Sequence, residues 1–246
     1  MKAVLRWAGM LLALGLALQL YFAARIALMA VVPPQSTAFQ RSEAVGLVRS
    51  GGFGKWRQHW VPYDQIAEPL KRAVIASEDS DFAHHGGVEW DAVQDAWQRN
   101  ARAEERAARR AAAARANAAA GRPPKVVGGS TITQQLAKNL FFSGERTLLR
   151  KGQELVVTLL LEALLPKQRI LEIYLNNVEW GEGVFGAEAA AQRYFNKPAA
   201  RLSGAEAARL AVVLPRPRYF ERLPHSAYVA GRASTIVSRM GAVDLP

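Results

Sequence analysis

Hydrophobic residues are concentrated at the N-terminal end of the chain. An uncharged apolar run covers residues 7–24, and the stretch that follows Arg25 is again apolar. Together the two pieces exceed the roughly 20 residues that a helix needs to cross the hydrocarbon core of a bilayer. Lys2 and Arg6 precede the run, and positive charge favours the cytoplasmic side. The pattern predicts one membrane-spanning helix with a cytoplasmic N-terminus.

A cleaved signal peptide and a buried core helix are the alternatives for this run. The run is longer than the apolar part of a signal peptide, and no A-x-A cleavage pattern follows it. Its place at the extreme N-terminus disfavours a core helix. We therefore expect residues 1–38 to comprise the cytoplasmic N-terminus, the anchor and a linker, with the rest of the chain on the outer side of the membrane.

Apolar positions at helical spacing recur after the anchor, as in Ile66, Leu70 and Val74. Helices are expected at residues 64–77, 89–100, 131–142, 148–165, 167–176, 187–195, 204–214 and 226–240. Strand signals are sparse, with one alternating stretch at residues 52–61. The expected fold class is mainly α, with one globular domain at residues 39–246.

Composition narrows the classes of partner. The chain has no cysteine, which excludes disulfides and thiolate metal sites, and its formal net charge is +11. Much of this charge lies in residues 99–125, where eight Lys/Arg residues outnumber two Glu residues. We interpret residues 101–125 as a solvated Ala/Arg-rich insertion whose arginines meet anionic lipid headgroups. The rest of the chain is only mildly basic, which disfavours nucleic-acid binding.

Candidate chemistry begins with the segment GGSTITQQLAKNLFF at residues 128–142. Thr131 and Gln134 form a capping-box pattern that predicts a helix start. A helix N-terminus followed by Lys138 suits an anion such as phosphate, and Arg146 could supply a second cation. An ordinary capped helix with solvated polar residues explains the same pattern.

Carboxylates strengthen the case for a reaction site. Glu78, Asp79 and Asp81 follow an apolar helix, where partial burial would raise a carboxyl pKa towards that of a useful base. A second acid, Glu154, opens another apolar helix. Two separated carboxylates with a phosphate-binding site are suited to glycosyl transfer from a sugar pyrophosphate.

Metal binding by the paired histidines is not expected. The paired His84 and His85 lack the carboxylate–histidine spacing of a catalytic zinc site. The aspartates could instead cap turns, and Arg150 and Lys151 could belong to a solvated face.

Taken together, these segments resemble the peptidoglycan glycosyltransferase domain, glycosyltransferase family 51. The matching motifs, in order, are ED-x-x-F-x-x-H-x-G at 78–87, GSTITQQL-x-KN at 129–139, RK-x-x-E at 150–154 and ILE-x-YLN at 170–176, followed by WG-x-G at 180–183 and G-x-EAA at 186–190. Their order and spacing agree as well. The insertion makes the region between the first two motifs longer than is usual for the family.

The resemblance implies a lysozyme-like glycosyltransferase fold and two essential carboxylates. Glu78 would be the general base for the C4 hydroxyl of lipid II, which attacks the lipid-linked glycan with inversion. Lys138 and Arg146 would bind the pyrophosphate, and Glu154 would be the second carboxylate. The implied substrate-binding residues are Asp79, Phe82, His85, Ser130, Thr131, Gln134, Gln135, Lys138, Asn139, Arg146, Arg150, Lys151 and Asn176.

The same resemblance implies the surroundings of the enzyme. A divalent cation, Mg²⁺ or Mn²⁺, would bridge the pyrophosphate, with Glu78 as the one side chain considered as a ligand, and no organic cofactor is expected. Lipid II, the growing glycan, the membrane and cell-wall synthesis proteins would be the partners. The catalytic domain would face the periplasm from the inner membrane. The chain leaves no room for a transpeptidase domain, so a monofunctional enzyme is expected.

Two other classes of function compete with this interpretation. A lysozyme-like hydrolase or lytic transglycosylase would share the acid and the fold, but it would need neither the pyrophosphate site nor the anchor. A non-enzymatic scaffold would have a broken site, whereas every matched motif position is filled.

Overall fold

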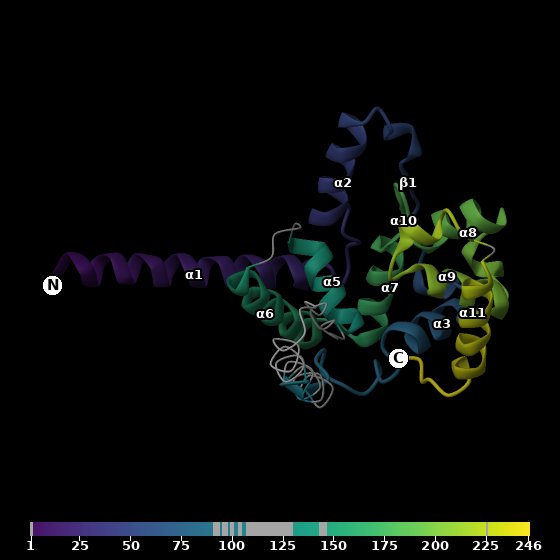
Figure 1. The fold of residues 1–246 in the computed structure, drawn as a ribbon. Coiled ribbons are helices and arrows are strands. Elements are labelled where there is room, and N and C mark those ends of the chain that lie inside the picture. Colours follow the sequence, from purple (N-terminus) through teal and green to yellow (C-terminus); the bar gives the residue numbers. More distant parts are fainter. Residues whose placement is uncertain are drawn as a thin grey trace, which may run out of the picture.

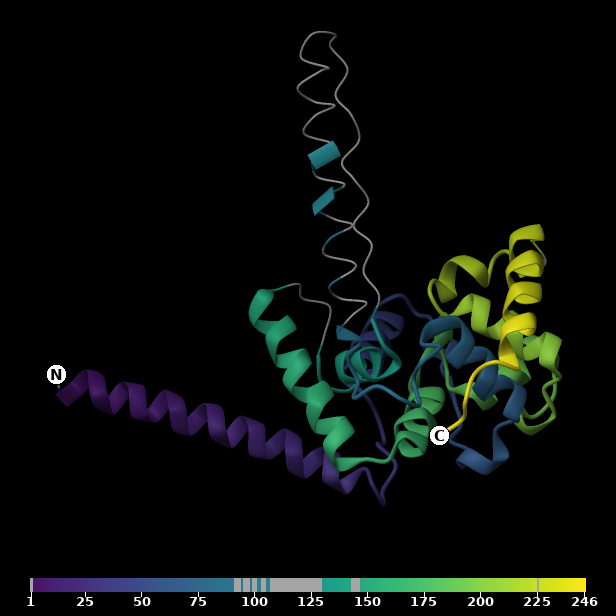
Figure 2. The same cartoon turned by 90° about the horizontal axis from the view of Figure 1, so that it is seen from below.

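The structure is a computed structural model that describes residues 2–90, 94, 98, 101–102, 105–106, 130–142, 147–224 and 226–246. The helix expected at 89–100 and the insertion at 101–125 lie largely outside these residues. In the described part, helices gather into one body from which a single long helix projects (Figures 1 and 2).

The projecting helix is α1 (Lys2–Leu28), and it is the one described helix that is long and apolar enough to cross a membrane. Its outer turns expose large apolar side chains such as Leu11 and Leu12. Such a surface requires an apolar environment. Its last turns differ, because Phe22 and Ile26 are buried against the body. The helix is therefore both a candidate anchor and a contributor to the core.

Polar contacts also hold this end of α1. The side-chain amides of Gln19 and Gln153 donate to each other's oxygens at 3.1 and 3.0 Å. Arg169 Nε donates to the carbonyl of Met29 at 2.8 Å. The expected boundary between anchor and catalytic domain at residue 38 is thus crossed by packing and hydrogen bonds.

Helix α2 (Ala38–Arg49) follows the linker and stands up from the body (Figure 1). Thr37 caps it, and Gln40 completes a capping box. The Gln40 amide also reaches the carbonyl of Asn177 at 3.4 Å. The base of α2 is fixed in this way, beside the C-terminal end of a later helix.

The β-structure is small. Strands β1 (Arg57–Gln58), β2 (Glu179–Gly181) and β3 (Val184–Phe185) form a sheet in the order β1-β3-β2. β1 pairs with β3 in parallel and β2 pairs with β3 antiparallel. The strand expected at 52–61 is wrong in extent, because Phe53–Lys55 form a 3₁₀ helix, η1.

Helix α3 (Glu68–Glu78) begins later than the expected residue 64. Tyr63–Gln65 form the 3₁₀ helix η2, and Pro69 occupies the first turn of α3, a position that tolerates proline. The remaining elements are α5 (Ile132–Phe141), α6 (Leu148–Leu164), α7 (Lys167–Asn177), α8 (Ala187–Phe195), η3 (Ala199–Arg201), α9 (Gly204–Val213), α10 (Pro217–Phe220) and α11 (Ala227–Met240). The short helices η3 and α10 were not expected, and the bounds of the others agree with the expected helices to within one residue.

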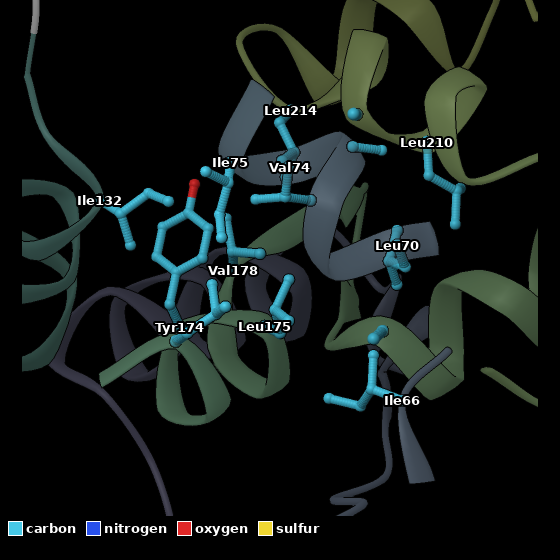
Figure 3. Close-up of a cluster of buried hydrophobic side chains, with 14 of the residues drawn as sticks. Ile66, Leu70, Val74, Ile75, Ile132, Tyr174, Leu175, Val178, Leu210 and Leu214 are labelled. Carbon is cyan, nitrogen blue, oxygen red and sulfur yellow. The ribbon is translucent and has the colours of Figure 1, made fainter. Parts of the chain in front are cut away.

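The core is built around α3, which packs against α9 and α11. Figure 3 shows Leu70 and Val74 of α3 facing Leu210 and Leu214, with Tyr174 and its neighbours from α7 on the other side. Leu70, Val74 and Ile75 have no exposed surface. Burial of this apolar face on both sides fixes the C-terminal end of α3, where Glu78 lies.

Candidate active site

An open cleft of about 430 Å³ lies between the base of α2, helices α5 and α6, and the segment that leads into α10. Its lining residues are Phe39, Gln135, Lys138, Asn139, Phe142, Arg150, Val178, Glu179, Leu214, Pro215 and Pro217. Four of the residues expected to bind substrate are among them: Gln135, Lys138, Asn139 and Arg150. Two consecutive helices, α5 and α6, therefore place polar side chains in one hollow.

Glu78 lies at the end of α3 and reaches the cleft through Gln135. Gln135 Nε2 donates to Glu78 Oε2 at 3.0 Å, and the Oε1 atom makes no hydrogen bond with any residue that the structure describes. Burial raises the pKa of Glu78, whereas the hydrogen bond from Gln135 lowers it. The Asp79 charge raises it further and Arg232 opposes this, with a net rise in pKa. A carboxylate with one free oxygen and a raised pKa is suited to accept a proton.

Asp79 connects α3 to the start of α5. Its carboxylate accepts from the backbone N–H of Ile132 at 2.9 Å and from His85 Nε2 at 2.7 Å. The Asp79 side chain is fully buried, and a carboxylate at a helix N-terminus is favoured by the unpaired N–H groups there. Asp79 therefore holds the two motif-bearing segments together.

His85 is fixed at both ring nitrogens. The N–H of Gly87 donates to Nδ1 at 3.0 Å, so the ring proton lies on Nε2 and is donated to Asp79. Burial lowers the pKa of His85, but the hydrogen bond and charge of Asp79 outweigh it, and the pKa is raised overall. The ring stands edge-on to Phe82. In the structure His85 orders the loop after α3.

Thr131 joins that loop to α5. Its hydroxyl donates to the Gly87 carbonyl at 2.6 Å and accepts from the N–H of Gln134, and the Gln134 side chain completes the capping box. Ser130 is exposed, and its carbonyl accepts from Gln135 Nε2 at 3.2 Å. The expected capping box is confirmed.

Gly87 is required by close packing. Its φ is +82°, and a Cβ there would lie 2.7 Å from Cγ of Glu162. Glu162 also accepts from Thr133 Oγ1 at 2.5 Å and from Lys167 Nζ at 2.9 Å. Helix α6 and the start of α7 thus support the loop from behind, which sequence spacing does not reveal.

Glu154 lies among cations. Arg150 Nη1 donates to Oε2 at 2.9 Å and Lys151 Nζ to Oε1 at 3.3 Å. The Glu154 side chain is only 5% exposed, whereas that of Lys151 is 56% exposed. In the structure Glu154 balances positive charge on the same helix.

Lys138 adjoins this group. Partial burial lowers its pKa, and the Glu154 charge opposes that effect. Arg150 and Lys151 lower the pKa of Lys138 further, as nearby like charges do. Positive charge is therefore concentrated at the α5–α6 side of the cleft, and an anionic ligand there would reduce the repulsion between these cations.

Besides Asp79, two of the expected substrate-binding residues have side chains with no accessible surface. Phe82 is fully buried beneath the Lys167 ammonium, which lies 4.5 Å from the ring centroid. Asn176 is fully buried as well. Its amide pairs with the N–H and carbonyl of Val61 at 2.9 Å each and also donates to the carbonyl of Glu172. In the structure both residues support the site from within.

Arg146 lies outside the described residues, as does Gly129 at the start of the second motif. The role expected for Arg146 therefore stays a prediction.

Glu179 is a cleft residue that sequence analysis missed. It belongs to β2, is 7% exposed, and accepts from Arg218 at 3.0 Å. Arg218 also pairs with Glu43 of α2. Burial raises the pKa of Glu179 to about 7 despite the Arg218 charge. A single glutamate in a strand of three residues produces no periodic pattern in the sequence, so only the folded structure reveals Glu179.

One group of three potential metal ligands occurs among the described residues: Asp79, His85 and Glu89. It does not fit a metal ion, because His85 uses both ring nitrogens and each Asp79 oxygen already accepts a hydrogen bond. His84 lies apart from it and contacts Asp81 and Asp244.

Three features define the class of this protein: the loop after α3 with its buried Asp79, the capped helix α5 and the cleft lined by Lys138 and Arg150. The chain belongs to the transglycosylase family, whose model matches residues 47–241. This match confirms the family resemblance and the mainly α, lysozyme-like fold class expected from the sequence.

Relatives match over nearly the whole chain. Two are the biosynthetic peptidoglycan transglycosylases of Burkholderia thailandensis and Burkholderia pseudomallei, each 51% identical over 100% of this chain and 90% of the relative. A third, from Burkholderia orbicola and with the same description, is 52% identical over 94% of this chain and 86% of the relative.

Proposed function

We propose that the protein is a peptidoglycan glycosyltransferase that polymerises glycan strands from lipid II. The C4 hydroxyl of lipid II attacks the anomeric carbon of the lipid-linked growing chain. The bond from that carbon to the pyrophosphate oxygen breaks, the configuration inverts from α to β, and undecaprenyl pyrophosphate leaves. The family match and the printed names of the relatives support this activity.

Glu78 is the general base in this proposal. Its Oε1 atom takes the proton of the attacking hydroxyl while Gln135 holds Oε2. Burial, which raises the pKa of the carboxyl, makes it a stronger base than a solvated glutamate.

The pyrophosphate binds at the cationic side of the cleft. Lys138 and Arg150 line it, and Arg146 is proposed as a further contact. Fixed cations placed where negative charge develops on a leaving group stabilise the transition state. Because the Glu154 carboxylate pairs with both Arg150 and Lys151, it would act by positioning these cations.

A divalent cation, Mg²⁺ or Mn²⁺, is proposed as part of the bound substrate. It would neutralise charge on the pyrophosphate oxygens. Glu78, the one side chain that the sequence suggested as a ligand, is left to act as the base, because metal coordination would compete for its second oxygen. No residue has a role in the proposed reaction that depends on this cation.

The enzyme would act at the outer face of the inner membrane. The exposed apolar turns of α1 support an anchor, and Lys2 and Arg6 support a cytoplasmic N-terminus. Lipid II, the growing glycan, anionic lipids and cell-wall synthesis proteins are the proposed partners.

One observation carries the proposal: a single helix, α5, places Gln135 against Glu78 and Lys138 in the cationic cleft. Base and leaving-group site are thereby held at a fixed separation along one rigid element.

The test is polymerisation of lipid II by the full-length protein in detergent. Glu78→Gln is expected to lower turnover at least ~100-fold, the contribution typical of a positioned base. The matched control is Glu68→Gln, which makes the same change on the same helix at a side chain that is 61% exposed; it should retain activity.

Two results would contradict the proposal. Undiminished polymerisation by Glu78→Gln would exclude the base role. Shortening of preformed glycan without release of lipid pyrophosphate would instead indicate a lytic enzyme.

A further inference from the structure

Three side chains from three helices form a continuous chain of hydrogen bonds that ends at Glu78. The Tyr174 hydroxyl of α7 donates to Gln135 Oε1 at 3.0 Å. Gln135 Nε2 of α5 donates to Glu78 Oε2 at 3.0 Å and to the Ser130 carbonyl at 3.2 Å. Both the NH₂ group and the oxygen of the Gln135 amide are therefore hydrogen bonded.

The acceptors fix the orientation of this amide. An ionised carboxylate and a carbonyl can only accept, so the NH₂ group must face Glu78 and Ser130. The amide oxygen then faces Tyr174, whose hydroxyl must donate. The reversed amide would set its oxygen against the Glu78 carboxylate and lose both bonds.

Tyr174 is suited to hold that orientation permanently. It is 1% exposed, so water does not readily replace its hydroxyl. Burial, with smaller effects of the Glu78 and Asp79 charges, raises the pKa of Tyr174 well above its ordinary value, and the hydroxyl keeps its proton. Figure 3 shows its ring among core side chains, beside Ile75 and Ile132.

The hydrogen bond from Gln135 opposes the effects that raise the pKa of Glu78. Burial, as the largest effect, and the adjacent Asp79 charge favour the protonated carboxyl, whereas Gln135 and Arg232 of α11 favour the ionised form. Without the Gln135 N–H, burial would act with less opposition and less of the base would be ionised at a given pH.

We propose that Tyr174 is a positioning residue that fixes the Gln135 amide, so that Gln135 holds one oxygen of Glu78 and leaves the other to accept the substrate proton. This inference rests on the proposed function, in which Glu78 is the base. Tyr174 itself touches no substrate.

The experiment compares pH–rate profiles of lipid II polymerisation by the full-length protein in detergent. Tyr174→Phe keeps the ring and removes one hydroxyl. We expect turnover near neutral pH to fall about fivefold, the effect of one hydrogen bond between neutral groups. The acidic limb of the profile should move to higher pH by at least about half a unit, because the pKa of Glu78 rises.

A matched control separates this effect from general loss of packing. Tyr194→Phe removes a hydroxyl that donates to the Trp180 carbonyl at 2.7 Å, away from Glu78. It should leave the acidic limb in place even if it lowers the melting temperature.

A double substitution tests whether Tyr174 acts through Gln135. Gln135→Met should move the acidic limb in the same direction, and adding Tyr174→Phe should move it no further, since coupled residues are non-additive. Equal, additive shifts would overturn the proposal. So would a wild-type limb in Tyr174→Phe or, if that variant does not fold, in Gln135→Met.

Failure of this inference differs from failure of the proposed function. If Glu78→Gln is inactive while Tyr174→Phe has the wild-type profile, the positioning role is wrong and the base survives. If Glu78→Gln polymerises normally, the base assignment is wrong and the positioning role fails with it.

Discussion

Glu78 and Glu154 look alike in the sequence, yet the fold places them in opposite electrostatic surroundings. Glu78 has a neutral amide as its hydrogen-bond donor, one oxygen that accepts no hydrogen bond from any described residue, and a raised pKa. Glu154 is nearly buried and bonded to Arg150 and Lys151 through both oxygens. The difference teaches that a carboxylate can be kept ready for protons or kept compensated by charge, and that neighbours decide which.

The largest expected effect concerns Lys138. It lies on α5, which carries Gln135 beside Glu78 and packs against α6, the helix of Glu154. Lys138→Ala should lower turnover about 100-fold or more, because charge on the leaving pyrophosphate loses a fixed cation. The measurement is steady-state release of lipid pyrophosphate. Lys55→Ala, at an exposed lysine paired with Glu182, is the control, and near-normal turnover by Lys138→Ala would contradict the cleft assignment.

Glu179 adds a third carboxylate and sharpens the comparison, because burial dominates even beside Arg218. Its pKa is raised from 4.5 to about 7, so the folded state binds this proton more tightly than the unfolded chain. Its contribution to stability therefore falls as pH rises from about 4.5 to 7, by at most roughly 3 kcal/mol.

Glu179→Gln removes this titration. The stability of the variant relative to wild type should grow across that pH window, measured as melting temperature in detergent. A difference independent of pH would show that Glu179 keeps an ordinary pKa in the folded protein.

The two central glutamates should respond to neutralisation with opposite signs. Glu154→Gln leaves the half-buried Arg150 without its carboxylate and should cost about 1–3 kcal/mol, reduced because Lys151 is solvated. Glu78→Gln removes a buried charge whose pKa is raised, and should leave stability unchanged or slightly higher at neutral pH. Melting temperatures of both variants decide the matter, and equal losses would erase the distinction.

The smallest effect should come from the contact between α1 and α6. Gln153 precedes Glu154 on α6 and pairs with Gln19 of α1. Interhelical hydrogen bonds of this type contribute about 0.6 kcal/mol on average in membrane proteins. Gln19→Leu should lower the melting temperature slightly and leave the acidic limb of the pH–rate profile in place. If the acidic limb moved, the contact between α1 and α6 would affect the pKa of Glu78, and the separation of the two glutamates would be wrong.

Much of the architecture could be predicted because it rests on local signals. The capping box at Thr131 marks a helix start that the structure confirms, and Ser203 with Glu206 caps the predicted helix α9 in the same way. The strand expected at 52–61 was wrong in extent, because only Arg57 and Gln58 pair with β3, whose residues lie more than a hundred positions away. Assignment to the transglycosylase family is confirmed, whereas the roles of individual site residues stay predictions.

The site shows the same division. Spacing predicts that Gln135 and Lys138 share one face of a helix, and both line the cleft. Spacing cannot distinguish a residue in the cleft from one behind it, and Phe82 and Asn176 are fully buried. Nor does it indicate Glu179 or the hydroxyl of Tyr174, whose contacts join segments distant in sequence.

By itself, the sequence determined the apolar N-terminal helix, most of the amphipathic helices and the family, and it named candidates for the residues that carry the chemistry. These depend on composition, periodicity and short motifs, whose physics is local. Only the tertiary structure decided that Tyr174, Gln135 and Glu78 form one chain, that Glu154 is paired with cations and that the end of α1 joins the core. Burial and hydrogen-bond direction set those properties, and both arise when the helices pack.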